Sequence, residues 1–436
     1  MPPVRLRIWS LGLSAALAGA AIAPIAAAAP VAELTEEQLV EKAKKLNSET
    51  KTREDADAKL KALNKDKVNT PKLVKAAAKL QKAAKGDEKP FRYFATLVLA
   101  KAAHNAKDYD SAEIFYRACS DIAIDDLQSS EHITQAVDDH LDFLLFRKKN
   151  DAVIELAERV MAINGDQTLQ FFNNFEVAGK LLLARSRKGD TKDVLDTLDR
   201  LIKKSDGLFL YRQMKTRILV DAEKYEEAIK EYGLVIESIQ DNENIPKEQK
   251  DRFVHGTKYA LSGVYVTMNK IDEGTKILRE LVKADPENAT FKNDLGFIMC
   301  DNDQNLEESE KLIRDAIELD LKARKKALAE KKIDEAEAKK SNAAYLDSLG
   351  WVLYKQKKYD EALKYLLESA GSDDEESNHI EIWDHVGDCY LAMGKKKEAL
   401  ETFQKALKME DVTKKDGERR KKVTEKMKKL KAELAK

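Results

Sequence analysis

Small and large apolar residues recur at helical spacing along most of this chain, separated by charged residues. The same motif returns as KDYDSAEIFYRAC from residue 107, KYEEAIKEYGLVI from 224, KYDEALKYLLESA from 358 and KKKEALETFQKAL from 395. Each copy places a small residue four positions before an aromatic residue or a leucine, so both lie on one face of a helix. These pairs are Ala112 with Tyr116, Ala228 with Tyr232, Ala362 with Leu366, and Ala399 with Phe403. The pattern predicts a series of similar helices.

A glycine precedes two of these helices at equal spacing. Gly387 follows Gly350 by 37 residues, and Ala399 follows Ala362 by the same 37. A glycine inside a helix costs about 1 kcal/mol relative to alanine, so packing must offset this cost. We expect Gly350 to let one helix approach the next closely at Ala362. Each helix pair then leaves an apolar face that only the next pair can bury.

The rest of the chain is helical in pattern as well. Candidate helices at 35–46, 53–63 and 71–84 form a charged, alanine-rich lead-in over 29–90. Charged residues make up 36% of the chain, and the mean hydropathy is -0.54, with only 8 prolines and 17 glycines. No segment alternates β-branched and polar residues between turns as a strand would. These observations indicate an all-α chain built as a repeat array.

The repeated segments resemble the tetratricopeptide repeat, a 34-residue helix-turn-helix unit with the consensus W-x2-L-G-x2-Y, then A-x3-F, then P. The last two units match it at Leu346, Leu349, Gly350, Leu353, Ala362, Leu366 and Ser369, and at Trp383, Val386, Gly387, Tyr390, Ala399, Phe403 and Ala406. The resemblance implies an α-α superhelix, a solenoid of about eight units. Clear repeats are expected at 255–410 and degenerate ones at 91–254.

Three segments depart from a uniform array. Residues 321–342 are an insertion, expected to be a lengthened helix pair that projects from the stack or a solvated helix without function. The acidic loop 371–379 lacks the residue spacing of a calcium loop and is expected to be a linker, with attraction of a cation or basic partner as the alternative. The stretch 411–436 has eleven Lys or Arg against five acids. It is expected to be a basic capping helix, with a patch for an anionic envelope surface as the alternative.

In the family that these repeats resemble, the first helix of each unit lines a concave peptide groove through its fifth, ninth and twelfth positions. The resemblance therefore assigns the groove to Asn293, Phe297, Asp347, Trp351, Tyr354, Asp384 and Asp388, with Cys300 and Leu391 at further positions of the same kind. This acidic and aromatic surface suits a basic extended peptide or a partner's helix. Packing of Trp351 against the neighbouring unit as core is the alternative.

The first 28 residues have the features of a signal peptide. Arg5 and Arg7 precede a long apolar run, and Ala26 and Ala28 fit an A-x-A cleavage site. The alternative is an uncleaved anchor helix, because the run is long enough to span a bilayer. We expect cleavage near Ala28, a periplasmic or envelope-associated protein, and no stable membrane insertion afterwards.

No motif of a hydrolase, nucleotide-binding or redox site occurs. Asp384, His385 and Asp388 form a weak metal candidate, as do His132 and His140, and we expect neither a metal nor a cofactor. The three cysteines are too few for a disulfide framework and are expected to be buried as small apolar residues. With 77 basic and 78 acidic residues, no net field attracts nucleic acid.

Two functional classes remain open from the sequence. The first is a non-enzymatic, exported scaffold that binds a protein or peptide partner of basic character and helps to assemble a cell-envelope complex. The second is an accessory or regulatory subunit of an envelope enzyme or export system, with the active site on another chain.

Overall fold

The computed structural model describes residues 32–85, 88–126, 130–162, 167–205, 207–372, 379–409 and 413–435. The expected signal peptide at 1–28 lies outside them. Within these ranges every regular element is a helix and no strand occurs, so the all-α prediction is confirmed. None of the described helices combines the length and hydrophobicity that crossing a membrane requires. Two compact units can be distinguished, one comprising 32–205 with 217–224 and the other 207–216 with 225–435.

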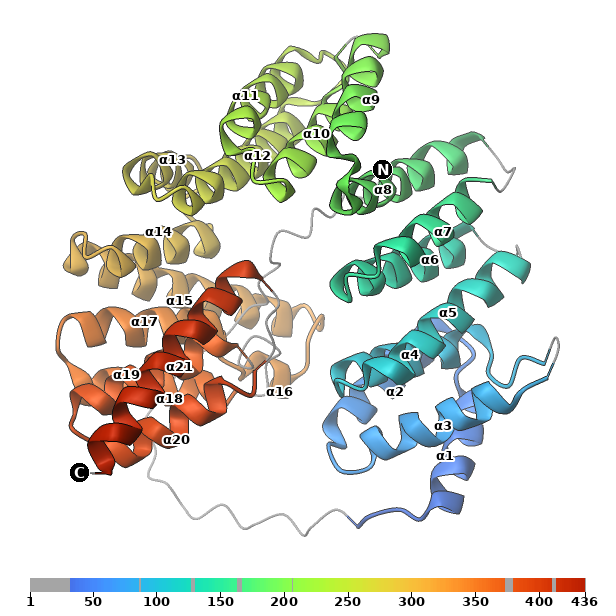
Figure 1. Ribbon diagram of the computed structural model, residues 1–436, viewed down its shortest axis with the longest axis horizontal. Coiled ribbons are helices and arrows are strands. Elements are labelled where there is room, and N and C mark those ends of the chain that lie inside the picture. The colour runs from blue at the N-terminus through green and yellow to red at the C-terminus, as the bar shows by residue number, and fades with distance from the viewer. Residues whose placement is uncertain are drawn as a thin grey trace. The chain divides into compact units, whose positions relative to one another are not determined.

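The N-terminal unit begins with the three lead-in helices, which lie within a few residues of their predicted positions. Helix pairs follow, each packed on the next (Figure 1). The helices are α1 (Glu36–Glu49), α2 (Arg53–Lys65), α3 (Thr70–Ala83), α4 (Tyr93–Asn105), α5 (Tyr109–Asp126), α6 (Ser130–Phe146), α7 (Asn150–Met161), α8 (Gln167–Arg185) and α9 (Thr191–Lys204), with a π-helical turn at Ser186–Asp190. The division between the two units falls inside α10 (Phe209–Asp221).

The C-terminal unit repeats the same arrangement and ends in a single helix. In it α12 packs on α13, α14 on α15, α17 on α18 and α19 on α20, and each pair contacts the next. Its helices are α11 (Tyr225–Asp241), α12 (Lys247–Thr267), α13 (Ile271–Ala284), α14 (Ala289–Asp301), α15 (Leu306–Ala329), α16 (Glu335–Ala338), α17 (Ala343–Lys355), α18 (Tyr359–Ala370), α19 (Ile380–Ala392), α20 (Lys396–Ala406) and α21 (Lys414–Leu434).

One turn geometry marks the pairs of both units. A residue with positive φ joins the two helices of a pair, and the small or apolar contact position of the second helix follows five residues later, or six in one pair. In the described residues this turn occurs eight times, at Lys107, Lys148, Gly189, Glu223, Asn269, Asp303, Lys357 and Gly394. The expectation of about eight helix-turn-helix units is therefore confirmed.

The glycines of the first helices lie where the two helices of a pair meet. A Cβ atom on Gly350 would lie 2.5 Å from Leu366 Cγ and 3.1 Å from the carbonyl oxygen of Ala362. At Gly387 the same addition would come within 2.3 Å of the Phe403 ring. The predicted close approach at Ala362 is thus confirmed, and it explains why a residue of low helix propensity is present.

The insertion differs in part from its prediction. It lengthens α15, which runs on to Ala329, but the expected second helix of the pair is wrong, because α16 has only four residues. The segment folds back on itself: the Arg324 guanidinium donates a hydrogen bond of 2.9 Å to the carbonyl of Glu337, and Ala338 is buried. Burial of this arginine against the turn explains why the segment does not form a separate helical hairpin.

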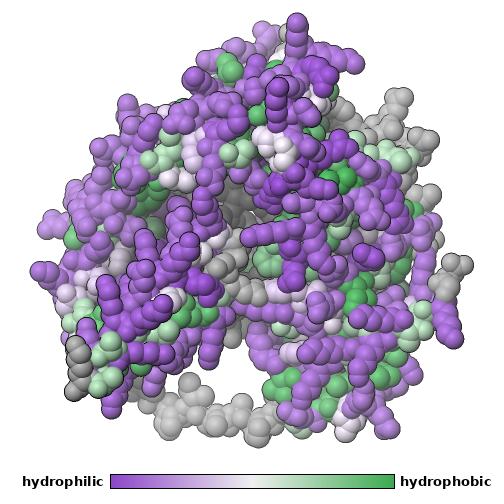
Figure 2. Space-filling model, viewed as in Figure 1, coloured by the Kyte–Doolittle hydropathy of each residue, from purple (hydrophilic) through white to green (hydrophobic). Residues whose placement is uncertain are grey.

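Apolar side chains gather between the helices rather than on the surface. The face shown in Figure 2 is mostly hydrophilic, with apolar residues in scattered patches. The three cysteines are buried free thiols, as the sequence predicts. The basic C-terminal stretch forms α21, whose Val423 and Leu430 are buried in a cluster with Phe403, so the capping-helix expectation is confirmed.

Candidate functional site

The seven residues assigned to the peptide groove, called the groove residues below, lie on three first helices of the C-terminal unit. Asn293 and Phe297 belong to α14, Asp347, Trp351 and Tyr354 to α17, and Asp384 and Asp388 to α19. Contacts between these helices and the ones that follow them bring most of the groove residues together.

Asp347 is paired with a histidine of the next unit. His385 Nδ1 lies 3.0 Å from each carboxylate oxygen of Asp347, and the His385 side chain is fully buried. A carboxylate only accepts hydrogen bonds, so this nitrogen holds the proton. Burial alone would lower the pKa of His385, but the Asp347 carboxylate reverses the effect and raises it above its ordinary value. The pair fixes α17 against α19.

An aromatic row covers this ion pair. The ring of Trp351 stacks on that of His385 at 4.0 Å between centroids and on that of Tyr354 at 4.8 Å. Trp351 Nε1 donates a hydrogen bond of 3.1 Å to Asp301 at the end of α14. Trp351 therefore contacts both neighbouring units. It packs as a core residue, as the alternative expectation stated.

The acidic pair of α19 is occupied by cations from α21. Lys426 Nζ lies 2.8 Å from Asp384 Oδ1 and 2.6 Å from Asp388 Oδ2, and Arg419 Nη1 lies 3.2 Å from Asp384 Oδ2. Arg419 also pairs with Glu381. Burial and the neighbouring Asp384 raise the pKa of Asp388. The arrangement leaves no open cation site between the two aspartates.

The exposure expected of the groove residues is wrong for four of them. Asn293, Asp347, Trp351 and Asp384 have relative exposures of 5%, 5%, 8% and 3%. They are buried because stacking, hydrogen bonds and ion pairs to neighbouring helices cover them. The partly exposed groove residues are Phe297, Tyr354 and Asp388. Burial and the Asp388 carboxylate raise the pKa of Tyr354 to about 12.

Asn293 differs from the other groove residues in its hydrogen bonding. Its amide nitrogen donates to Asp294 at 3.1 Å, whereas its buried carbonyl oxygen has no partner among the described residues. Asp294 is half-buried and accepts a hydrogen bond from the Tyr259 hydroxyl of α12. Burial raises the pKa of Asp294. The Asp294 carboxylate therefore ties α14 back to α12.

The N-terminal unit contains the same ties at equivalent positions. Lys180 of α8 is buried and pairs with both Asp138 and Asp142 of α6, four residues apart like Asp384 and Asp388. Lys101 of α4 lies 2.9 Å from Asp139 of α6. Pairing between successive first helices thus occurs in both units.

The residues that complete these ties were missed by sequence reasoning. The sequence pattern names His385 only as part of a weak metal candidate, and it places Lys426 in a basic capping helix without a partner. A signal does exist: a titratable residue stands nine positions before the positive-φ turn residue in four units, as Asp139, Lys180, Asp294 and His385. Recognising it requires the turn positions, which the structure supplies.

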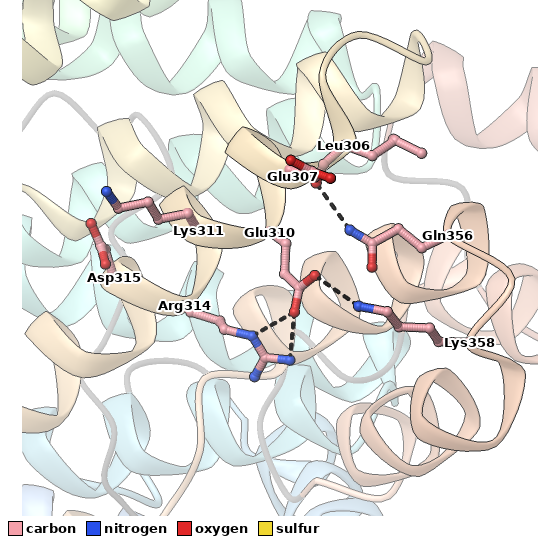
Figure 3. A pocket seen from close by; sticks show the side chains of 8 residues that line it. All are labelled: Leu306, Glu307, Glu310, Lys311, Arg314, Asp315, Gln356 and Lys358. Atoms are coloured by element: carbon pink, nitrogen blue, oxygen red, sulfur yellow. Dashed lines mark hydrogen bonds and ion pairs between the residues drawn. The ribbon is translucent and has the colours of Figure 1, made fainter.

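A polar hollow of about 690 Å³ lies on the second helices of the same unit (Figure 3). It is lined mainly by α15. Glu310 is surrounded by the cations Arg314 and Lys358, at 2.8 and 3.2 Å, and Gln356 donates to the carbonyl of Leu306. The Glu310 carboxylate at its centre is therefore already paired with two cations.

The histidines considered as metal candidates have other partners. His132 stacks on Tyr93 at 4.5 Å, and His140 shares a hydrogen bond of 3.0 Å with Ser120. No cluster of three potential metal ligands occurs among the described residues. Burial lowers the pKa of His140 to about 3, so this side chain is neutral in the folded N-terminal unit.

We expect the N-terminal unit to lose stability as the pH falls below about 6.5. Between about pH 6.5 and pH 3, His140 binds a proton in the unfolded chain but not in the folded one. Its contribution to the free energy of unfolding is therefore complete above the unfolded pKa and declines as the pH falls toward about 3. At pH 5 the loss should be about 2 kcal/mol. Urea unfolding of wild type and His140→Asn at pH 7 and pH 5 measures it. Equal acid sensitivity of both proteins would contradict this assignment. His255→Asn is the control variant, and it should keep the acid sensitivity of wild type.

The comparisons with known proteins agree with the repeat pattern. Residues 341–409, which contain α17 to α20, match the family model of the tetratricopeptide repeat. Among curated proteins none matches the chain. This segment therefore consists of tetratricopeptide repeats.

Solved structures show weaker similarity. Yeast Tom70 is 12% identical with a TM-score of 0.48, over 92% of this chain and 82% of that one. A tetratricopeptide repeat protein from Parabacteroides merdae is 12% identical with a TM-score of 0.39, over 76% and 98%. MamA is 18% identical with a TM-score of 0.30, over 44% and 91%. At these TM-scores the similarities carry no argument about function.

Proposed function

We propose that this tetratricopeptide-repeat chain is a non-enzymatic scaffold of the cell envelope that binds a basic peptide or helix of a protein partner. The observation that supports it best is the acidic pair Asp384 and Asp388, which holds Lys426 and Arg419 of a basic helix. The last unit thus has the chemistry to accept a basic helix lying across it. Tetratricopeptide repeats at 341–409 are consistent with this use.

The surface that remains accessible beside α21 defines where such a partner would bind. Phe297, Tyr354 and Asp388 are partly exposed, and Leu391 on α19 is 37% exposed. Aromatic side chains provide most of the binding energy in many interfaces, while a carboxylate mainly increases the association rate of a basic partner. The buried groove residues hold these contacts in place.

Removing the two accessible rings should weaken partner retention. We expect a chain with Phe297→Ala and Tyr354→Ala to retain its envelope partner at least tenfold less well than wild type, because truncated aromatic anchors commonly cost about 2 kcal/mol or more. Retention of proteins from envelope extract, quantified by mass spectrometry, measures it.

Leu367→Ala is the matched control, since Leu367 is an exposed apolar residue on the second helix α18. Equal retention by all three chains would contradict the proposal. If the retained partner is an enzyme, the chain acts as its accessory subunit.

The location is part of this proposal and rests on the sequence. Arg5 and Arg7, the apolar run and Ala28 support export and cleavage. N-terminal sequencing of the chain from its source tests it. An intact terminus at Met1 or Pro2 in the membrane fraction would contradict cleavage and favour an anchor.

A further inference from the structure

Three pairs of adjacent lysines occur along α21 at intervals of seven residues. They are Lys414 with Lys415, Lys421 with Lys422, and Lys428 with Lys429. All six side chains are exposed. Seven residues advance a helix by about 10.5 Å and return to nearly the same side. The pairs therefore form one stripe, about 21 Å long, which we call the lysine stripe.

The packing of α21 determines which of its cations face outward. Val423 and Leu430 are buried on the opposite side of the helix. Arg419 and Lys426 pair with carboxylates of α19, and Arg420 donates to backbone carbonyls at the end of α20. These three cations hold the helix on the fold, whereas the lysines of the stripe other than Lys414 form no ion pair or hydrogen bond within the described residues.

Five of the six lysines in the stripe lack neutralising partners in the described part of the chain. Within the described part of the chain, none of its lysines except Lys414 has an ion-pair partner or other assigned contact. Glu418 and Glu425 lie on the same side, so six positive groups face two negative ones. A cap for a repeat array needs only a polar outer face, and this face is polar with a clear excess of one sign.

We propose that the lysine stripe adsorbs the chain on an anionic lipid surface through phosphate headgroups. This inference rests on the envelope location in the proposed function. Lysines near such a surface each add to binding, and their effect decays within a Debye length. A flat lipid surface can contact all three lysine pairs at once, because its headgroups move laterally and need no fixed spacing. The stripe holds no apolar ring or aliphatic side chain that would insert, so binding is peripheral.

The composition of the stripe argues against a nucleic acid as the ligand. It contains no arginine for bidentate phosphate contacts and no aromatic residue for stacking on bases. Glu418 and Glu425 would also face a phosphate backbone. These features favour loose adsorption on a lipid surface over a tight contact with nucleic acid.

Vesicle binding of the full chain tests this inference. We expect wild type to bind vesicles of phosphatidylcholine with about one quarter phosphatidylglycerol at low salt, and to be released at about 0.5 M NaCl. A variant with Lys421→Gln, Lys422→Gln, Lys428→Gln and Lys429→Gln should bind at least tenfold less well. Glutamine keeps high helix propensity, and a thermal melt confirms that α21 remains folded.

A second variant changes the net charge equally at scattered exposed positions. It carries Lys75→Gln, Lys276→Gln, Lys311→Gln and Lys325→Gln, and it should bind vesicles as wild type does. Equal loss in both variants, equal binding of wild type to neutral and anionic vesicles, or preference for a duplex DNA over anionic vesicles would each overturn the inference. Partner retention by the stripe variant is expected to be unchanged, so failure here is distinguishable from failure of the scaffold proposal.

Discussion

Gly350→Leu is expected to destabilise the C-terminal unit by about 3 kcal/mol, because the leucine must displace Leu366 and the backbone of α18. The first added atom alone would lie 2.5 Å from Leu366 Cγ. In a stack where each pair contacts only its neighbours, the N-terminal unit should be weakened much less. Urea unfolding followed by hydrogen exchange of separate segments measures both effects.

Gly263→Leu provides the matched control in the same unit. A Cβ atom on Gly263 would meet nothing within 4 Å, so the substitution should be neutral or stabilise α12 by up to about 1 kcal/mol. If Gly350→Leu instead reduces protection uniformly from α4 to α20, the chain unfolds as one cooperative globule and the repeat description of its stability is wrong.

Trp351→Ala is expected to cost about 3–5 kcal/mol of C-terminal stability, the range for removing a buried large aromatic side chain. Trp351 is 8% exposed, stacks on His385 and Tyr354, and donates to Asp301. Its removal therefore opens a cavity beside the buried Asp347–His385 pair. Denaturant midpoints read by circular dichroism measure the loss.

Trp383→Ala is the comparison for that variant. Trp383 is partly exposed with Lys405 over its ring at 4.9 Å, so its removal should cost clearly less. If Trp351→Ala leaves the midpoint unchanged while partner retention falls, Trp351 is a free groove residue, and the packing described for it is incorrect.

The fold was predictable because its signals are local. Gly350 and Ala362 lie on two adjacent helices joined by a short turn. The helical periodicity of small and apolar residues indicates which face of each helix makes the contact. The unit boundaries of the N-terminal half were harder to predict from sequence. Among the eight described turns, glycine takes the positive-φ position only at Gly189 and Gly394, and the other turns have lysine, glutamate, asparagine or aspartate there. Glycine is favoured at such a position but is not required.

The environment of the groove residues could not be predicted in the same way. Spacing assigns Asp347 and Asp384 to one helix face, but it does not reveal what packs on that face. Their partners, His385 and Lys426, lie 38 and 42 residues away in sequence. The sequence therefore overestimated the exposure of these aspartates, since a buried ion pair and an open acidic groove can start from the same residues.

Site-specific photo-crosslinking in the native cell tests the scaffold proposal most directly. A photoreactive residue at Leu391, on α19 beside Asp388, is predicted to crosslink a second protein, while one at Leu367 on α18 should not. These positions are 37% and 41% exposed, so accessibility does not separate them. Identical products from both positions, or products from Leu367 alone, would contradict binding at the groove residues of the C-terminal unit.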